Sequence, residues 1–273
     1  MFDLLLRPID PSKIFIIIGI VAFIAIVFTI LIVTVSKVCF VKTDERAENI
    51  ASNLAGANCG GCGYAGCADF AKALSEGKAE ISDCGPTSNE GKAEIAKILG
   101  IPFSGSEPMF AIVHCAGGAI SKDKFLYVGN EGCKAQNLFL GGRKQCPSGC
   151  LGGGTCKEIC PYHAIEIEKG VAFADKTLCE ACGVCVKNCP KNIIELIPKS
   201  AKVYVACSTH CKGREVIDAC SAGCISCGLC VKNCPKQAIV MDNGVPVIDY
   251  SKCSGCTVCV IKCPRKCIKL VKK

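Results

Sequence analysis

Hydrophobic residues fall into one long uninterrupted run near the start of the chain and many short ones after it. The run IFIIIGIVAFIAIVFTILIVTVS, residues 14–36, has no charged side chain over 23 residues. A helix of that length rises about 35 Å, enough to cross a hydrocarbon core of about 30 Å with some tilt. A cleavable signal peptide has a shorter apolar core, of about 7–15 residues, and an A-x-A site, which does not follow this run. We therefore predict a single transmembrane helix over residues 14–36 that contacts membrane lipid, preceded by an N-terminal segment, residues 1–13.

The charges beside this run say little about its orientation. Arg7 and Lys13 precede it, and Lys37, Lys42 and Arg46 follow it, so the positive-inside rule leans only slightly toward a cytoplasmic C-terminal part. Many thiols held as metal ligands need a reducing compartment. We expect a single-pass protein of the cell (inner or cytoplasmic) membrane with its soluble domains on the cytoplasmic side.

Periodic patterns predict short helices in the region that follows. Residues 42–55 have the spacing of an amphipathic helix, and further helices are expected over 68–75 and 89–99, the last ending at Gly100. These patterns predict a small helical domain over residues 37–100.

Two later stretches alternate apolar and polar residues around a glycine turn. They are AIEIEKGVAFADKTLC, residues 164–179, and AIVMDNGVPVIDYSKC, residues 238–253. Such alternation predicts short β-hairpins. The chain as a whole is therefore expected to be a multidomain α+β protein.

The chain has 27 cysteines among 273 residues. A high cysteine content is typical of small secreted proteins with disulfides. Here the number is odd, and the cysteines follow one another two or three residues apart, too close to bridge comfortably. Metal ligation explains the pattern better.

The first cysteine motif is ANCGGCGYAGC followed by a distant fourth cysteine. It supplies Cys59, Cys62, Cys67 and Cys84, and its glycines let the backbone wrap closely around an inorganic core. A structural zinc site usually presents two C-x2-4-C pairs, so this spacing favours a [4Fe–4S] cluster over zinc.

The second motif is a ladder closed by proline. The bacterial ferredoxin pattern C-x2-C-x2-C-x3-C-P occurs three times, and a fourth copy has altered spacing. The three regular copies are Cys179, Cys182, Cys185 and Cys189; Cys224, Cys227, Cys230 and Cys234; and Cys253, Cys256, Cys259 and Cys263. The altered copy is Cys146, Cys150, Cys156 and Cys160.

The copies pair into tandem two-cluster ferredoxin units. A shift of 74 residues places nine cysteines on cysteines, including Cys133 on Cys207, so a unit is duplicated over residues 101–198 and 199–273. In such units the cysteine before proline binds the other cluster of the pair. The expected ligand sets are Cys146, Cys150, Cys156 and Cys189; Cys160, Cys179, Cys182 and Cys185; Cys224, Cys227, Cys230 and Cys263; and Cys234, Cys253, Cys256 and Cys259.

The duplication leaves one ligand in conflict and several cysteines without a role. In the second unit Cys227 or Cys220 could complete the first loop, and the regular spacing favours Cys227; its counterpart in the first unit is Gly153. Five clusters are expected, and a sixth is left open, with Cys115, Cys133, Cys207 and Cys220 as its candidate ligands. The alternative is that these thiols, with Cys39, Cys211 and Cys267, bind nothing.

The net charge changes once clusters are counted. The formal charge of +8 suggests nucleic acid or anionic partners. A [4Fe–4S]2+ core with four thiolates carries a net charge of about −2, so five of them would bring the chain to about −2. We therefore expect no nucleic-acid partner.

The sequence offers no site for substrate turnover. His114, His163 and His210 have no evident acidic partner, and GGGT at 152–155 lies inside a ligand loop rather than after a strand. Iron–sulfur clusters pass single electrons and need no general base. The pattern thus indicates an electron relay with no catalytic residues of its own.

The order of anchor, NCGGCGYAGC motif and ferredoxin ladders resembles the iron–sulfur B subunit of the Rnf complex, a membrane-bound ion-translocating ferredoxin:NAD+ oxidoreductase, over essentially the whole chain. The second ferredoxin unit departs from shorter members of that family. The resemblance implies that soluble reduced ferredoxin donates electrons, which pass to membrane-embedded and flavin- or NAD-binding subunits with coupled Na+ or H+ pumping. The chain would thus act within a translocase.

Other interpretations stay open at this point. A hydrogenase or a corrinoid-reducing system could use a similar electron-transfer subunit, and an iron–sulfur redox sensor would need an effector segment that the sequence does not show. The basic C-terminus could dock an acidic ferredoxin or simply be solvated. Its charges are Lys262, Arg265, Lys266, Lys269, Lys272 and Lys273.

Overall fold

The computed structural model describes residues 11–38 and 44–272, apart from the side chains of residues 11–14 and 38. Cys39, Lys42 and the segment 1–10 lie outside the described residues. Contacts divide the chain into two units, Met1–Asp44 and Glu45–Lys273. The division into smaller domains stays a prediction.

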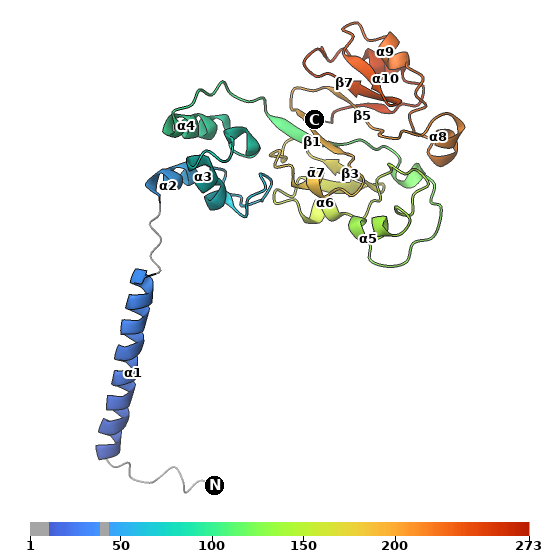
Figure 1. The fold of residues 1–273 in the computed structure, drawn as a ribbon. Helices are drawn as coiled ribbons and strands as arrows, with labels where there is room; N and C mark the ends of the chain where they lie inside the picture. Colours follow the sequence, from blue (N-terminus) through green and yellow to red (C-terminus); the bar gives the residue numbers. More distant parts are fainter. Residues whose placement is uncertain (1–10, 39–43, 273) are drawn as a thin grey trace, which may run out of the picture. The chain divides into compact units, whose positions relative to one another are not determined.

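The first unit contains the apolar helix α1, Pro11–Val38 (Figure 1). Its segment Phe15–Lys37 has a mean hydropathy of 3.4 and is long and apolar enough to cross a membrane. The hydroxyls of Thr29 and Thr34 donate to the carbonyls of Ala25 and Ile30, at 2.7 and 2.8 Å, so neither polar group is left unpaired. The predicted helix is confirmed and extends a few residues beyond the predicted range at each end.

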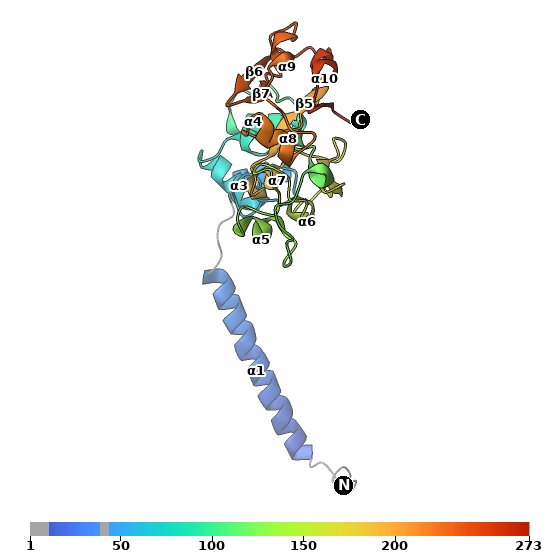
Figure 2. The ribbon, with the colours of Figure 1, turned by 90° about the vertical axis from the view of Figure 1, so that its right-hand side faces the viewer.

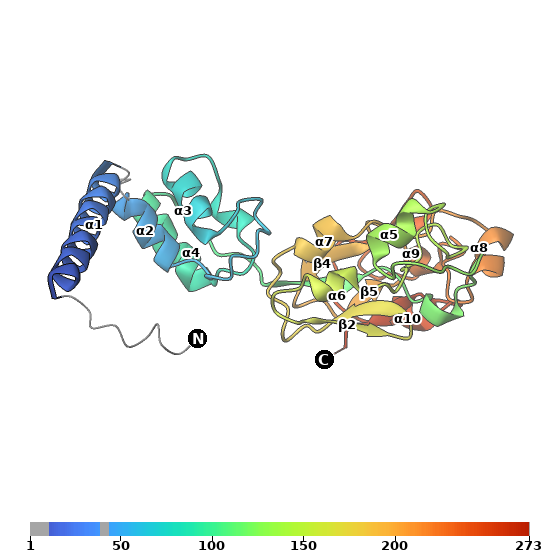
Figure 3. The same cartoon turned by 90° about the horizontal axis from the view of Figure 1, so that it is seen from below.

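Three helices form a small domain at the start of the second unit (Figure 3). They are α2 (Glu45–Ser52), α3 (Cys67–Ser75) and α4 (Asn89–Leu99), with a short 3-10 turn, η1, at Ile81–Asp83. Phe70, Ile50 and Ile95 fill their shared core and are at most 1% exposed. Gly100 ends α4 in the left-handed conformation, as the sequence predicted.

The rest of the chain contains two ferredoxin-like units with the same plan. In the first, β1 pairs antiparallel with β4, and the hairpin β2–β3 lies between the ligand loops; in the second, β5 pairs with β8 around the hairpin β6–β7. The strands are β1 Met109–Val113, β2 Ile165–Glu168, β3 Val171–Ala174, β4 Ile194–Pro198, β5 Val203–Val205, β6 Ile239–Asp242, β7 Val245–Ile248 and β8 Ile268–Leu270. Both predicted hairpins are confirmed.

Short helices follow the ligand loops and carry the third cysteine of each. They are α6 (Thr155–Glu158) and α7 (Val184–Asn188) in the first unit, and α9 (Leu229–Lys232) and α10 (Val258–Lys262) in the second. Figure 2 shows α9, α10 and the β6–β7 hairpin gathered in one part of the fold. The hydrophobic core of each unit packs against these cysteines, so the fold positions the sulfurs directly.

The first unit carries an insertion that the ungapped repeat concealed. Cys115 follows β1 as Cys207 follows β5, and the two residues form an antiparallel bridge. Cys115 precedes Cys150 by 35 residues, whereas Cys207 precedes Cys224 by only 17. The correspondence of Cys133 with Cys207 was therefore wrong: Cys115 is the structural counterpart, and Cys133, at the start of α5 (Cys133–Leu138), lies within the additional chain of the first unit.

Candidate iron–sulfur centres

The four-cysteine loop is shaped by glycines and two polar side chains. Gly60 and Gly63 have φ angles of 67° and 95°, which side-chain-bearing residues rarely adopt. The Asn58 amide oxygen accepts from the N–H of Cys67 at 2.8 Å. Buried Thr87 lies with its hydroxyl 3.1 Å from the Cys84 sulfur, where it can donate to a thiolate.

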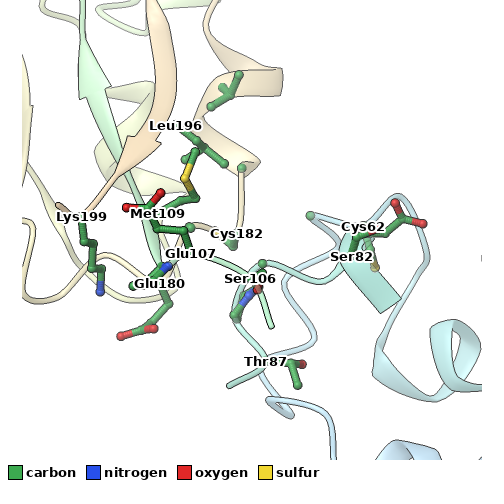
Figure 4. A pocket seen from close by; sticks show the side chains of 18 of the residues that line it. Cys62, Ser82, Thr87, Ser106, Glu107, Met109, Glu180, Cys182, Leu196 and Lys199 are labelled. Atoms are coloured by element: carbon green, nitrogen blue, oxygen red, sulfur yellow. The ribbon is translucent and has the colours of Figure 1, made fainter. Parts of the chain in front are cut away.

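This loop packs against the first ferredoxin unit. A Cβ on Gly61 would lie 2.0 Å from the carbonyl oxygen of Cys182, and Lys187 donates to the carbonyl of Gly61 at 2.5 Å. A cleft of about 720 Å³ runs along the junction and is lined by Cys62 and Cys182 (Figure 4). The junction therefore places ligands of two predicted clusters on one cleft.

The regular ladder of the first unit forms a compact set. Cys185 is buried, and this burial is the main reason why its thiol pKa is raised to about 12. The negative charges of Cys179 and Cys182 raise the pKa further. Cys160 adds a weaker effect of the same sign, which places this cross-ligand beside the loop. Thiolates at these buried positions would repel one another, and a cationic iron core would remove that cost.

The pocket beside the altered ladder is lined by a cysteine from an unexpected place. A pocket of about 20 Å³ is lined by Cys133, Cys150, Cys156 and Cys189. Burial, then the charges of neighbouring Cys150 and Cys133, raises the pKa of Cys156 to about 12. Cys146, the expected fourth member, does not line this pocket.

Gly153 explains how Cys133 reaches that set. It occupies the position where the regular ladder has a cysteine, and a Cβ there would lie 2.1 Å from the Glu131 carbonyl and 2.9 Å from the backbone nitrogen of Cys133. That N–H donates to the Thr155 hydroxyl at 2.9 Å. The insertion thus packs onto the empty position and supplies a sulfur there.

In the second unit the regular loop itself supplies three cysteines to one pocket. A pocket of about 20 Å³ is lined by Cys224, Cys227, Cys230, Cys263 and Cys267. Cys267, which the sequence left without a role, lies 3.4 Å from the Cys263 sulfur. It also donates to Cys224, and this hydrogen bond lowers the pKa of Cys224 to about 6.

The last set belongs to the C-terminal ladder. Burial, then the charge of Cys253, raises the pKa of Cys259, with a smaller contribution from Cys256. Cys234 accepts from the N–H of Ala238 at 3.3 Å, as expected for a sulfur that carries negative charge in a cluster.

Four further cysteines line one cavity between the two ferredoxin units: Cys115, Cys146, Cys207 and Cys220. Cys211 also lines this cavity, whereas Cys133, which the sequence suggested for the extra set, does not.

The arrangement fits iron–sulfur clusters better than zinc. Among the residues described, no group of three or more His, Cys, Asp or Glu is placed to hold a single metal ion. Four sulfurs around one zinc, each at about 2.3 Å, would lie within about 4 Å of one another. The cysteines instead line pockets in sets of four or more, the number of thiolates that a four-iron cube needs.

One histidine does have an acidic partner, contrary to the sequence-based expectation. His114 Nε2 lies 2.6 Å from a Glu195 carboxylate oxygen, and its Nδ1 lies 2.6 Å from the Val205 carbonyl oxygen. The hydrogen bond to His114 lowers the pKa of Glu195. The pair joins β4 of the first unit to β5 of the second, so its evident role is to connect the two units.

Family models match three parts of the chain. A model for an Fe-S cluster matches residues 54–86, a 4Fe-4S binding domain matches residues 172–195, and a 4Fe-4S dicluster domain matches residues 223–267. These matches fall on the four-cysteine domain and on both ferredoxin units. The chain therefore binds [4Fe–4S] clusters.

Three relatives match most of the chain, and each is the B subunit of a membrane complex. The one from the Na(+)-translocating ferredoxin:NAD(+) oxidoreductase complex of Acetobacterium woodii is 39% identical over 86% of this chain and 72% of its own length. The one from the ion-translocating oxidoreductase complex of Methanosarcina acetivorans is 38% identical over 88% and 92%. The one from the proton-translocating ferredoxin:NAD(+) oxidoreductase complex of Clostridium ljungdahlii is 36% identical over 89% and 87%.

Fold, cysteine sets and apolar helix together define a membrane-anchored iron–sulfur electron-transfer subunit of the ferredoxin type. The relatives specify which one: the chain belongs to the family of B subunits of Rnf-type ion-translocating oxidoreductase complexes.

Proposed function

We propose that this chain accepts electrons from reduced ferredoxin and relays them to the other subunits of an ion-translocating ferredoxin:NAD+ oxidoreductase. The observation that carries the proposal is the contiguity of the cysteine sets. The four-cysteine loop packs onto the Cys182 loop, and Cys185 feels the charge of Cys156 in the neighbouring set. Clusters on these sets would be close enough for single-electron transfer.

We further propose that five clusters have ligands from the family's motifs, with one change from the sequence-based sets. Cys133 replaces Cys146 in the first unit because it lines the pocket with the other three cysteines. The sets are Cys59, Cys62, Cys67 and Cys84; Cys133, Cys150, Cys156 and Cys189; Cys160, Cys179, Cys182 and Cys185; Cys224, Cys227, Cys230 and Cys263; and Cys234, Cys253, Cys256 and Cys259.

Each cluster would supply one-electron redox chemistry, and the protein sets its surroundings. Buried apolar residues exclude water from the sulfurs, and backbone N–H groups stabilise the more negative reduced state. The N–H of Ala111 directed at the Cys179 sulfur, at 3.4 Å, is one such donor.

Ion translocation itself is assigned to other subunits, whether the ion is Na+ or H+. Residues 14–36 contain no charged side chain, and ion pathways in membranes require polar or ionisable groups. The helix would anchor the chain in lipid, with the cluster-bearing unit on the cytoplasmic side, where thiols remain reduced.

The basic C-terminus offers less docking charge than the sequence suggested. Arg265 donates to the carbonyls of Cys220 and Gly223, at 2.8 and 3.1 Å, and Lys272 pairs with Glu168 at 2.7 Å. Lys262 and Lys266 remain exposed. Docking of an acidic ferredoxin would therefore depend on fewer charges, and Lys273 lies outside the described residues.

Deletion of this chain from the complex, with complementation in membrane vesicles, tests the function. Ferredoxin-dependent NAD+ reduction should disappear on deletion, return with the wild-type chain, and not return with the Cys59→Ser/Cys62→Ser variant. Persistent NAD+ reduction without the chain would contradict the proposal. A chain that instead restores hydrogen or corrinoid chemistry would assign it to another assembly.

A further inference from the structure

The cavity between the ferredoxin units is lined by two related pairs of cysteines. Cys115 and Cys207 each follow the first strand of their unit, and Cys146 and Cys220 each precede a ladder by four residues. Each pair therefore consists of one residue from each unit at the same structural position. Isolated leftover thiols would have no reason to match in this way.

The backbone contacts of the two halves also match. The N–H of Cys150 donates to the Cys115 sulfur at 3.4 Å, and the N–H of Cys224 donates to the Cys207 sulfur at 3.3 Å. The tight turns after Cys146 and Cys220 close with hydrogen bonds of 3.1 and 3.2 Å to their carbonyls. Each unit thus contributes an equivalent half of one site.

The cavity has room for an inorganic core. Its volume is about 100 Å³. The pocket lined by Cys150 and the pocket lined by Cys224 each have a volume of only about 20 Å³. Gly117 keeps this room open, because a Cβ there would lie 3.1 Å from the Cys220 sulfur and 3.7 Å from the Cys115 sulfur.

The surroundings hold two of these sulfurs away from water and fix one of the loops that carry them. Cys207 and Cys220 are each 8% exposed. Arg265 fixes the Cys220 loop by donating to the Cys220 carbonyl at 2.8 Å, which brings a cation close to a ligand of a cluster whose net charge would be about −2.

The position of the cavity gives it a role in the relay. Cys150, a ligand in the first unit, donates to one of its cysteines, and Cys224, a ligand in the second unit, donates to another. The cavity therefore lies directly between a cluster set of each unit. Without a redox centre there, electrons would have to cross the unit boundary in one longer step.

We propose that Cys115, Cys146, Cys207 and Cys220 bind a sixth [4Fe–4S] cluster shared by the two ferredoxin units, and that this cluster is the link between their electron paths. The proposal deepens the electron-transfer function given above and rests on it. It replaces Cys133 by Cys146 in the extra set considered from sequence. Each electron enters from one neighbouring cluster and leaves to the other, so no further reactant is needed.

Iron and acid-labile sulfide in the full-length chain, purified anaerobically in detergent, test the site without ferredoxin or NAD+. The wild type should contain about 24 irons, and the Cys115→Ala/Cys207→Ala variant about 20. The matched control Cys211→Ala removes a thiol that lines the same cavity and should keep about 24. The dithionite-reduced variant should also lose about one cluster's spin by EPR.

Variants of Cys146 and Cys220 keep the test decisive if the first variant misfolds. If the first variant loses more than one cluster, Cys146→Ala and Cys220→Ala are measured singly, and each should lose about four irons. A wild type with about 20 irons, or ligand variants that keep the wild-type content, would overturn the sixth site. Because neither ferredoxin nor NAD+ is involved, failure here leaves the proposed ferredoxin:NAD+ activity untouched, and loss of that activity would not alter the iron count.

Discussion

The two ferredoxin units show two ways of completing the same cluster loop. In the second unit Cys224, Cys227 and Cys230 come from one continuous loop. In the first unit the middle position is Gly153, and the sulfur at that place comes from Cys133, about twenty residues earlier, in the insertion. On the proposed assignment a ligand set depends on where the sulfurs lie in space, and a missing motif cysteine need not mean a missing cluster.

The largest expected effect separates Cys133 from Cys146, which the sequence placed in the extra set and in the first ladder, respectively. If Cys133 and Cys146 serve different clusters, Cys133→Ala and Cys146→Ala should each lose about four irons, and the double variant about eight. Cys227→Ala is the matched change in the second unit and should lose about four. Iron and sulfide analysis provides the measurement. A double variant that loses no more than either single one would place both cysteines on one cluster.

A smaller effect is expected from filling the empty position of the first loop. In Gly153→Ala the new Cβ meets the Glu131 carbonyl at 2.1 Å and pushes the Cys133 segment away. Loss of ligand support typically weakens metal binding by about 10–100-fold. In the presence of a chelator, the variant should therefore lose the iron of one cluster more readily than the wild type.

A control glycine in the second unit is Gly228, the counterpart of Gly154, whose φ is 69° and whose Cβ would meet nothing within 4 Å. Gly228→Ala should cost only backbone strain, about 1–2 kcal/mol, without displacing a ligand. Equal iron loss in the two variants would mean that the Gly153 contact has no special role.

A third effect concerns the hydrogen bond that holds Cys133 in place. Thr155→Val removes the acceptor of the Cys133 N–H, and an unsatisfied backbone donor costs about 1–3 kcal/mol. Iron should leave the first unit faster under a chelator, while Thr155→Ser, which keeps the hydroxyl, should behave as the wild type. Equal rates of iron release from the valine and serine variants would show that this hydrogen bond does not help to hold the cluster.

The smallest effect is expected at the His114–Glu195 contact. Its carboxylate is well exposed, so Glu195→Gln should lower the free energy of unfolding by only about 0.2–1 kcal/mol. Because the folded pKa of Glu195 is lowered, its stabilisation is present above the ordinary carboxyl pKa and is lost as pH falls through the lowered value. The thermal midpoint of the variant should therefore depend less on acidic pH. An unchanged pH profile would show that the pair contributes nothing measurable.

Much of the fold could be predicted because its signals are local. The apolar run gave α1, alternation around a glycine gave both hairpins, and ladder spacing gave three regular loops. The proposed exchange of Cys133 and Cys146 could not be predicted, because it depends on how an insertion folds back onto Gly153. The ungapped register hid that insertion, although the similar strand ends at Cys115 and Cys207 were a signal for it. The partner of His114 lies 81 residues away and has no sequence pattern.

The central claim is that electrons cross from one ferredoxin unit to the other through a continuous row of clusters. Freeze-quench EPR of the whole complex, mixed with reduced ferredoxin, tests it most directly. In the wild type the clusters of both units should become reduced together. In the Cys115→Ala/Cys207→Ala variant the clusters on one side should reduce at the wild-type rate and those on the other side much more slowly. Reduction of both sides of the variant at the wild-type rate would contradict the account.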